Sequence, residues 1–435
     1  MNYVIIANTV FSLIYTLLGL LISHFIVFAI VGVFFNKKYP KADKKLRYGL
    51  VIPARNEEKV IANLIKSIQA SSYPAEKLEV FLMAHNCTDR TADIGRELGI
   101  HVYEYNNPNE CTKGYAFRYL FSQIEKDFGT QNFDGFIVFD ADNIVCEDYF
   151  DKLNDAFVAG DRKNVVISFR NSKNFGENPM SAMYGLYFMY GCRLEARGRA
   201  VFGCSTRVQG TGFVMSSEIV KDGWKYLTLT EDWEFTADQI LQNTKIAYCD
   251  EAVFYDEQPT NFRVMWRQRL RWQRGHLLVF VSRYRELIKS LFKSKKRGGT
   301  KHKVSAYDFS INILPVGIIG ISVALLHLIM LLIAPLIGDY NVLSLIVDYL
   351  KTYGLSLGTS YFTVILSALA LLIIERKRIP KVNFFTMAIA VVLFPAFILL
   401  AAIFDVMALF TKNLGWKTIP HKNTTAITDI KSTVK

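Results

Sequence analysis

The chain has 435 residues, of which 51% are hydrophobic and 14% aromatic, and it carries a formal net charge of +12. The apolar residues gather in long runs at the two ends, which argues against a single soluble globule. Much of the positive charge lies beside these runs. It therefore favours contact with anionic lipid headgroups over nucleic acid as a partner.

The N-terminal apolar stretch covers residues 3–35, whereas a helix needs only about 20 such residues to cross a bilayer. We expect a transmembrane segment over residues 1–36, either one long tilted span or a span with an interfacial turn. A cleaved signal peptide is the alternative, but no basic region precedes the run. By the positive-inside rule, the basic residues after the run predict a cytosolic central region. These residues are Lys37, Lys38, Lys41, Lys44, Lys45 and Arg47.

The central region, residues 46–257, alternates apolar strand-like runs with helical patterns, which is typical of a doubly wound α/β domain. We expect the first strand at 48–52, ended by the proline that follows it. Apolar residues then recur over 60–68 at the spacing of one helical face. Later strands are expected at 78–83 and 136–139. All six cysteines fall in the central region, and we expect them to be reduced.

Polar residues follow each of these three expected strands. They are Arg55-Asn56-Glu57, the run from His85 to Asp89, and Asp140-Ala141-Asp142. Ligands bind beyond the carboxyl ends of strands in open α/β sheets, so the three clusters are expected to converge on one crevice. No GxGxxG follows the first strand, which weakens a dinucleotide-binding interpretation.

Two acidic segments are candidates for metal binding and catalysis. Asp140 and Asp142 suit a hard divalent cation, Mg²⁺ or Mn²⁺, that also holds a diphosphate, although an ordinary solvated turn is the alternative. Thr230-Glu231-Asp232 offers a carboxylate able to take a proton from an acceptor hydroxyl, and Asp232 is the candidate base with Glu231 beside it. The alternative for this second segment is a helix N-cap with acidic first-turn residues.

Residues 258–307 form an amphipathic, Arg-rich and Trp-rich stretch. Gln268, Arg271 and Trp272 share one helical face there. The Trp ring offers a flat surface for a sugar, and Arg pairs with phosphate oxygens. An interfacial helix anchored by its aromatic and basic residues is the alternative. The basic cluster near its end, expected to contact lipid headgroups, comprises Lys293, Lys295, Lys296, Arg297, Lys301 and Lys303.

The last part of the chain is expected to hold membrane helices over 308–411 and a tail over 412–435. Its apolar blocks run over 311–337, 355–374 and 384–410, each long enough to span a bilayer. Basic residues at 376–378 and in 412–422 both predict the cytosolic side, yet one block separates them. Either that last block, which contains Pro395, is re-entrant, or the tail faces outward.

The ordered combination of motifs from about Leu50 to Gly275 resembles the membrane-embedded, processive members of glycosyltransferase family 2. These include cellulose, chitin, hyaluronan and poly-N-acetylglucosamine synthases. Residues 51–57 resemble the family's opening strand and nucleotide loop, and residues 86–89 its second nucleotide-contacting segment. Residues 268–272 are similar to its QxxRW motif. The resemblance implies a GT-A, Rossmann-like cytosolic domain inserted between transmembrane helices.

The resemblance also implies roles for individual residues. The base is Asp232, and the metal ligands are Asp140 and Asp142. The nucleotide-binding residues are Pro53, Ala54, Arg55, Glu57, Asn86, Asp89, Lys113, Asp140 and Arg271. The acceptor-binding residues are Gly210, Thr211, Gly212, Gln268 and Trp272. His85 departs from the pattern, since many relatives carry an acid there, and we expect it to be a satisfied structural histidine.

The implied activity is inverting, processive β-glycosyl transfer from a UDP-sugar to a growing extracellular polysaccharide that is threaded through the spans of a multi-pass cell-membrane protein. One alternative is a non-processive enzyme that adds a single sugar to a lipid. Another is a membrane transporter or scaffold whose α/β domain only binds nucleotide.

Overall fold

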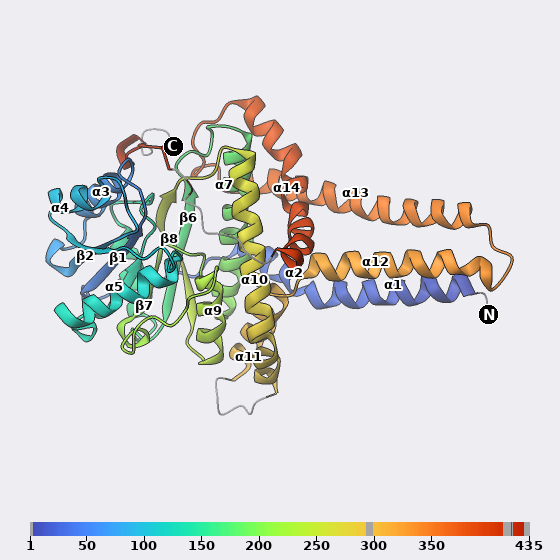
Figure 1. Ribbon diagram of the computed structural model, residues 1–435, viewed down its shortest axis with the longest axis horizontal. Helices are drawn as coiled ribbons and strands as arrows, with labels where there is room; N and C mark the ends of the chain where they lie inside the picture. The colour runs from blue at the N-terminus through green and yellow to red at the C-terminus, as the bar shows by residue number, and fades with distance from the viewer. Residues whose placement is uncertain (1–2, 293–298, 412–418, 420, 430–435) are drawn as a thin grey trace.

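The computed structural model describes residues 3–292, 299–411, 419 and 421–429. It consists of an α/β domain from which a group of long helices projects (Figure 1). Four basic residues of the predicted lipid-contacting cluster, at positions 293 and 295–297, lie outside the described residues. So does most of the basic stretch that begins at position 412.

The α/β domain is built on one eight-stranded sheet with the order β3-β2-β1-β4-β7-β6-β8-β5. The first four strands of this order are parallel, β7 is antiparallel to both of its neighbours, and β6 and β8 are parallel. The strands are β1 (Tyr48–Ala54), β2 (Leu78–His85), β3 (His101–Tyr105), β4 (Gly135–Val138), β5 (Ile144–Val145), β6 (Val165–Ser172), β7 (Phe213–Ser216) and β8 (Ile246–Asp256). The predicted α/β fold class is confirmed.

Helices cover both faces of this sheet because the central strands are apolar on both sides. In β1, Leu50 and Ile52 pack with Leu64 of α3, whereas Val51 packs with Phe117 of α5 on the other face. The helices of the domain are α3 (Ile61–Gln69), α4 (Thr91–Glu97), α5 (Lys113–Asp127), α6 (Tyr149–Val158), α7 (Pro179–Tyr190), α8 (Arg197–Phe202) and α9 (Glu231–Leu241), with a π-helical turn at Gly191–Ala196 and 3-10 turns at Ala75–Lys77, Thr130–Asn132 and Ser217–Ile219. The helix expected over 60–68 is α3, and its apolar face is buried.

The expectation that proline ends the first strand is wrong, because β1 continues through Pro53 to Ala54. The Val51 carbonyl accepts a hydrogen bond from the Phe139 N–H, so alternate residues of β1 direct their backbone groups toward β4. Pairing with β4 stops at Val51, whereas pairing with β2 continues beyond it. Pro53 therefore stands where no ladder hydrogen bond is required of its nitrogen.

Within the described residues, four helical segments are long and apolar enough to cross a membrane. They are α1 (Tyr3–Ile22) with α2 (His24–Phe34), α12 (Val316–Ile333) with a 3-10 turn (Ala334–Leu336), α13 (Val342–Ile374) and α14 (Phe384–Phe410). The first C-terminal block starts later than expected because α11 (Gly299–Asn312) and Pro315 precede it. The second starts earlier, at Val342.

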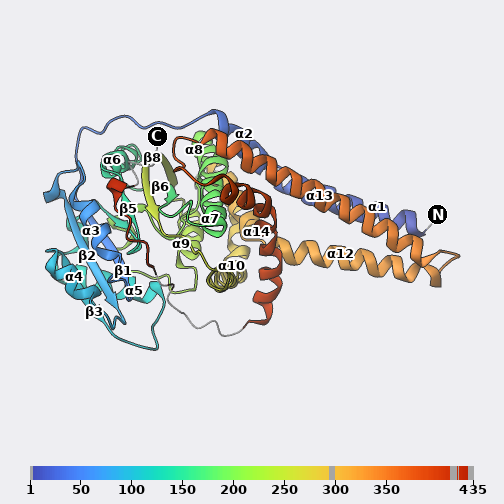
Figure 2. The same ribbon diagram turned by 90° about the horizontal axis from the view of Figure 1, so that it is seen from above.

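Three of these segments project together from the α/β domain. Figures 1 and 2 show α1, α12 and α13 side by side, with α14 lying across their base. His327 of α12 joins all three, since its Nε2 lies 2.9 Å from Asn8 Oδ1 of α1 and its Nδ1 lies 3.1 Å from the Tyr353 hydroxyl of α13. Tyr353 in turn donates to the Tyr15 hydroxyl of α1 at 3.1 Å.

The fourth apolar helix, α14, packs against α7 and α10 (Phe262–Leu291) rather than running along the projecting helices. Both of its ends lie by the α/β domain. Before α14, Arg378 donates to Asp250 at 2.9 Å. After it, the tail returns to the domain, where Asn63 Nδ2 donates to the Thr424 carbonyl at 2.9 Å. These contacts contradict an outward-facing tail and agree with the re-entrant alternative for the last block.

Candidate active site

A cavity of about 440 Å³ lies between the sheet domain and α10. Most of the predicted site residues line it: Pro53, Ala54, Arg55, Glu57, Lys113, Asp140, Asp142, Gly210, Glu231, Asp232, Gln268, Arg271 and Trp272. They come from the ends of β1 and β4, the starts of α5 and α9, and one face of α10. The expected convergence of strand-end clusters with the QxxRW face is therefore present in the structure.

Four predicted residues, namely Asn86, Asp89, Thr211 and Gly212, do not line the cavity and instead shape its surroundings. Asn86 has a positive φ of 54°, and its side chain exchanges hydrogen bonds with the Asn107 backbone. Asp89 accepts from the N–H of Thr91 at 3.0 Å. The Thr211 hydroxyl accepts a hydrogen bond from the Asp140 N–H at 2.8 Å, which helps to hold the backbone of this acid in place.

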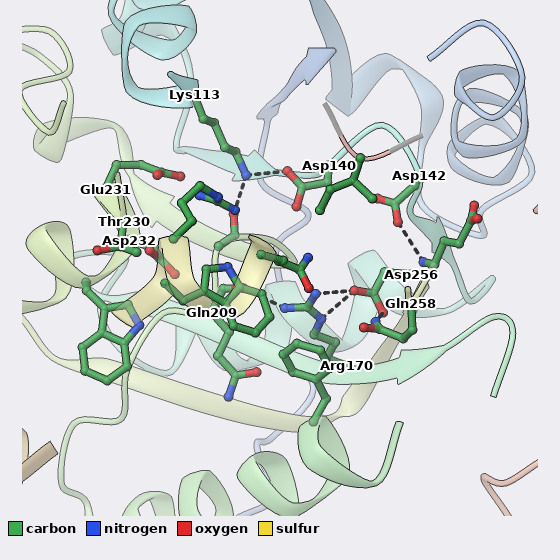
Figure 3. Close-up of a pocket in the computed structure, with 18 of the residues that line it drawn as sticks. Lys113, Asp140, Asp142, Arg170, Gln209, Thr230, Glu231, Asp232, Asp256 and Gln258 are labelled. Carbon is green, nitrogen blue, oxygen red and sulfur yellow. Dashed lines mark hydrogen bonds and ion pairs between the residues drawn. The ribbon is translucent and has the colours of Figure 1, made fainter. Parts of the chain in front are cut away.

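Lys113 and Asp140 meet at one end of the cavity. Lys113 is the first residue of α5, and its Nζ donates to Asp140 Oδ1 at 2.5 Å and to the Gly210 carbonyl at 2.7 Å (Figure 3). Burial lowers the pKa of Lys113, but the charges of Asp140 and Glu231 outweigh burial, so the net pKa is raised. The ammonium is therefore charged and lies where an anionic diphosphate could pair with it.

Asp142 is buried beside Glu57 and the returning tail. Its Oδ2 accepts from the Glu257 N–H at 2.7 Å and lies 4.0 Å from Nε2 of His421. The His421 Nδ1 donates to Glu57 at 2.9 Å. Burial opposes protonation of His421, but Asp142 and Glu57 outweigh burial and raise its pKa to about 10. His421 was not predicted as a site residue, because no local sequence pattern places the tail here.

The acids at 140 and 142 fit a divalent cation that is shared with a substrate. Within the described residues, no group of three or more His, Cys, Asp or Glu side chains could hold a metal ion alone. Mg²⁺ commonly takes one or two carboxylates and completes its shell with water and phosphate oxygens. Two neighbouring hard oxygen donors at a cavity that also carries Lys113 match that requirement.

Glu231 and Asp232 open α9 and face the same cavity (Figure 3). Burial raises the pKa of both acids, Glu231 to about 7 and Asp232 to about 6, while the Lys113 charge opposes the rise. The neighbouring Asp232 charge raises the pKa of Glu231 further. A carboxylate with a pKa near 6 is largely ionised at neutral pH and is a stronger base than an exposed aspartate.

Helix α10 closes the cavity from the membrane-helix side. Arg271 Nη1 donates to the Leu229 carbonyl at 2.9 Å, which ties the helix to the turn before the acids. Gln268 Oε1 accepts from the Tyr184 hydroxyl at 2.7 Å, and the Trp272 ring meets Tyr184 edge-on at a centroid distance of 6.3 Å. Trp266, one of the aromatic residues by which the interfacial-helix alternative would anchor this helix, packs against Phe404 of α14.

A second polar group in the cavity wall, centred on Arg170, was not predicted from the sequence. This residue donates to Asp256 Oδ2 at 2.7 Å and to the Gln209 carbonyl at 3.0 Å, and its guanidinium lies 3.6 Å from the Phe188 ring centroid (Figure 3). Burial raises the pKa of Asp256 to about 6 against the effect of Arg170. Arg170 lies on β6 and Asp256 ends β8. Neither strand was identified from the sequence, so the residues near their carboxyl ends were not considered as ligand-binding candidates.

His85 differs from the expectation of a satisfied structural histidine. It is buried at the end of β2, lines the cavity and stacks on Tyr105. Its Nε2 has no hydrogen-bond partner within the described part of the chain. Burial lowers the pKa of His85, which leaves a neutral ring at the nucleotide-loop end of the cavity.

Comparison with known proteins agrees with this geometry. Residues 46–275 match the family described as glycosyltransferase-like family 2. The chain belongs to this family. Among its relatives is the probable glycosyltransferase YdaM of Bacillus subtilis, 25% identical over 60% of this chain and 63% of that protein. Another is the beta-monoglucosyldiacylglycerol synthase of Synechocystis, 24% identical over 54% of this chain and 49% of that protein. The chain thus spans less than two thirds of the length of the first relative and about half the length of the second.

A protein of known structure has a similar arrangement of sheet and helices. The mannosyltransferase PcManGT of Pyrobaculum calidifontis, solved with GDP-Man and Mn²⁺, superposes with a TM-score of 0.55 at 14% identity. The match covers 86% of this chain and 97% of that one. It supports the predicted GT-A sheet domain with apolar helices before and after it.

Proposed function

We propose that this protein transfers a sugar from a UDP-sugar to a hydroxyl of a membrane lipid, with inversion at the anomeric carbon. The observation that best supports a lipid acceptor is how far the cavity extends. It runs from Lys113 and Asp140, past Asp232, to the apolar side chains of Val364, Phe394 and Ile398. These last residues lie on α13 and α14, so a lipid acceptor can keep its chains among apolar helices while its headgroup reaches the acids.

The chemistry follows from the charges along the cavity. Asp232 takes the proton of the acceptor hydroxyl as its oxygen forms the bond to the anomeric carbon. The bond from that carbon to the diphosphate breaks at the same time, and UDP leaves with the electron pair. Asp140 and Asp142 would hold the Mg²⁺ or Mn²⁺ that, when bound, neutralises charge on the departing diphosphate. Lys113 adds a fixed positive charge there.

The observation that favours a lipid acceptor over a threaded polymer concerns the projecting helices. Packed helices lie about 8–10 Å apart, and side chains fill the space between them. His327 and Tyr353 link α1, α12 and α13 by hydrogen bonds, so at this level the polar side chains of the three helices pair with one another rather than with a sugar chain. The name of the Synechocystis relative, a glycolipid synthase, supports the same choice.

The proposed orientation places the catalytic domain in the cytosol. Lys37 and Lys38 follow the N-terminal helix, and Arg376 and Lys377 follow α13. Both basic pairs lie at the ends of the projecting helices that adjoin the sheet domain, and the positive-inside rule assigns those ends to the cytosol. The Glu231–Asp232 pair argues against a transporter or scaffold, because nucleotide binding alone needs no base.

The test is product analysis with purified protein in lipid vesicles, given Mn²⁺ or Mg²⁺ and each of several radiolabelled UDP-sugars. The expected result is one glycolipid band of defined size together with an equal amount of UDP. A ladder of long, lipid-free chains would reject the lipid acceptor in favour of a polymer. Folded protein that releases no UDP with any donor would reject the catalytic proposal itself.

A further inference from the structure

On α10, His276 lies one helical turn after Trp272 and lines the same cavity, although no sequence pattern singled it out. The glycine before it, Gly275, lies so close to the turn before α9 that a Cβ there would stand 2.4 Å from Thr230 Oγ1. The His276 ring then lies against Trp233, with 3.8 Å between ring centroids. Trp233 directly follows Asp232 in the chain, and His276 lines the same cavity as the candidate base.

The hydrogen bonds of the ring define its tautomer. His276 Nδ1 lies 2.9 Å from Gln273 Oε1, while Gln273 Nε2 is directed to the Ala401 carbonyl at 3.5 Å. An amide oxygen only accepts, so Nδ1 carries the proton and Nε2 keeps its lone pair. No residue in the described ranges hydrogen-bonds to Nε2. The ring therefore offers an unused acceptor at the cavity wall.

The charge state of His276 agrees with its acting as a hydrogen-bond acceptor. Burial, reinforced by the charges of Arg207 and Arg271, lowers the pKa of His276 to about 3. The ring is neutral at physiological pH and acts as a hydrogen-bond acceptor rather than as an acid or a cation. A phosphate or carboxylate offers no proton to such a group, whereas a hydroxyl does.

We propose that His276 binds the acceptor, with Nε2 accepting a hydrogen bond from a hydroxyl next to the reactive one. The inference rests on the proposed function and names its substrate more closely. The reactive hydroxyl gives its proton to Asp232, so His276 requires a second hydroxyl on the same headgroup. Trp272 lines the same cavity and offers a flat surface for a sugar ring. The acceptor class is therefore a lipid that already bears a sugar, rather than a lipid with a single hydroxyl.

The experiment compares two substitutions in the full-length protein. His276→Phe keeps an aromatic ring against Trp233 but removes the lone pair, and His276→Gln keeps an acceptor oxygen. His101→Phe, at the edge strand β3, is the matched control. Initial rates are measured with vesicles containing glucosylated diacylglycerol and with vesicles containing plain diacylglycerol. UDP affinity is measured by calorimetry without acceptor.

The expected result is that wild-type protein prefers the glucosylated lipid. His276→Phe should raise the KM for this lipid about tenfold, the effect of one lost hydrogen bond, with donor KM and UDP affinity within twofold. His276→Gln should recover part of the loss. An unchanged acceptor KM in His276→Phe, equal loss in both variants, or equal use of both lipids by the wild type would overturn the inference while leaving the proposed function standing. Transfer to neither lipid by folded wild-type protein would overturn both.

Discussion

Replacing Gly275 with alanine tests whether the contact between α10 and the turn at residues 229–233 sets the geometry of the acidic site. The added Cβ would lie 2.4 Å from Thr230 Oγ1, whereas ordinary van der Waals contact begins at 3.4 Å. The helix and the turn must therefore separate by about 1 Å, the difference between these two distances. Arg271 and His276 would move with the helix, away from Asp232.

A displacement of about 1 Å in a catalytic site costs on the order of 100-fold in rate. We therefore expect kcat of Gly275→Ala to fall about 100-fold, with a smaller loss of UDP affinity, because Lys113 and Asp140 lie on other elements and Arg271 alone of the expected nucleotide-binding residues moves with the helix. Intrinsic helix propensity favours alanine over glycine by about 1 kcal/mol. A gain in thermal stability without a loss of rate would therefore show that the contact is not tight.

The assay is transfer of radiolabelled sugar at saturating donor, with Tm measured on the same preparation. Gly320→Ala is the control, because a Cβ at this α12 position meets nothing within 4 Å. A kcat for Gly275→Ala within twofold of the wild-type value would refute the claim that this contact positions the acids.

Three further predictions concern the acids and the apolar end of the cavity. Asp232→Asn should lower kcat by about 10²–10⁴-fold with UDP affinity kept, as checked by single-turnover rates and calorimetry; loss of UDP binding instead would place Asp232 in the nucleotide site. The base must be ionised to act, and its pKa is about 6 with its partner at about 7, so kcat/KM should fall as pH drops below about 7; a flat profile from pH 5 to 8 would contradict this assignment. Ile398→Asp should raise the acceptor KM but not the donor KM, and equal effects on both would argue against a lipid path beside α14.

Much of the site could be predicted from the sequence because its signals are local. Asp140 and Asp142 follow a short apolar run, and the carboxyl ends of parallel strands meet at one edge of a sheet. Gln268 and Trp272 share a helical face through their spacing alone. Each of these inferences needs only strand alternation or helix periodicity over a few residues, and the structure brings all four side chains to one cavity.

The sequence did not predict residues whose placement depends on long-range packing. Arg170 and Asp256 meet because β6 and β8 pair in parallel, although 86 residues separate them in the chain. His421 reaches Glu57 across 364 residues. Asn86 and Asp89 occupy the expected loop, yet their side chains turn to neighbouring backbone because loop conformation, rather than motif, sets their direction.

The sequence by itself determined that apolar helices flank an α/β domain, since run length and periodicity depend on neighbouring residues. Only the tertiary structure decided how those helices are used. α14 is as apolar as α12 and α13, but its packing against α7 and α10 turns it across the base of the projecting helices. Hydropathy measures the preference of a segment for an apolar environment, and both a bilayer and a helix interface satisfy that preference. The direction in which an apolar helix runs therefore depends on the elements it packs against.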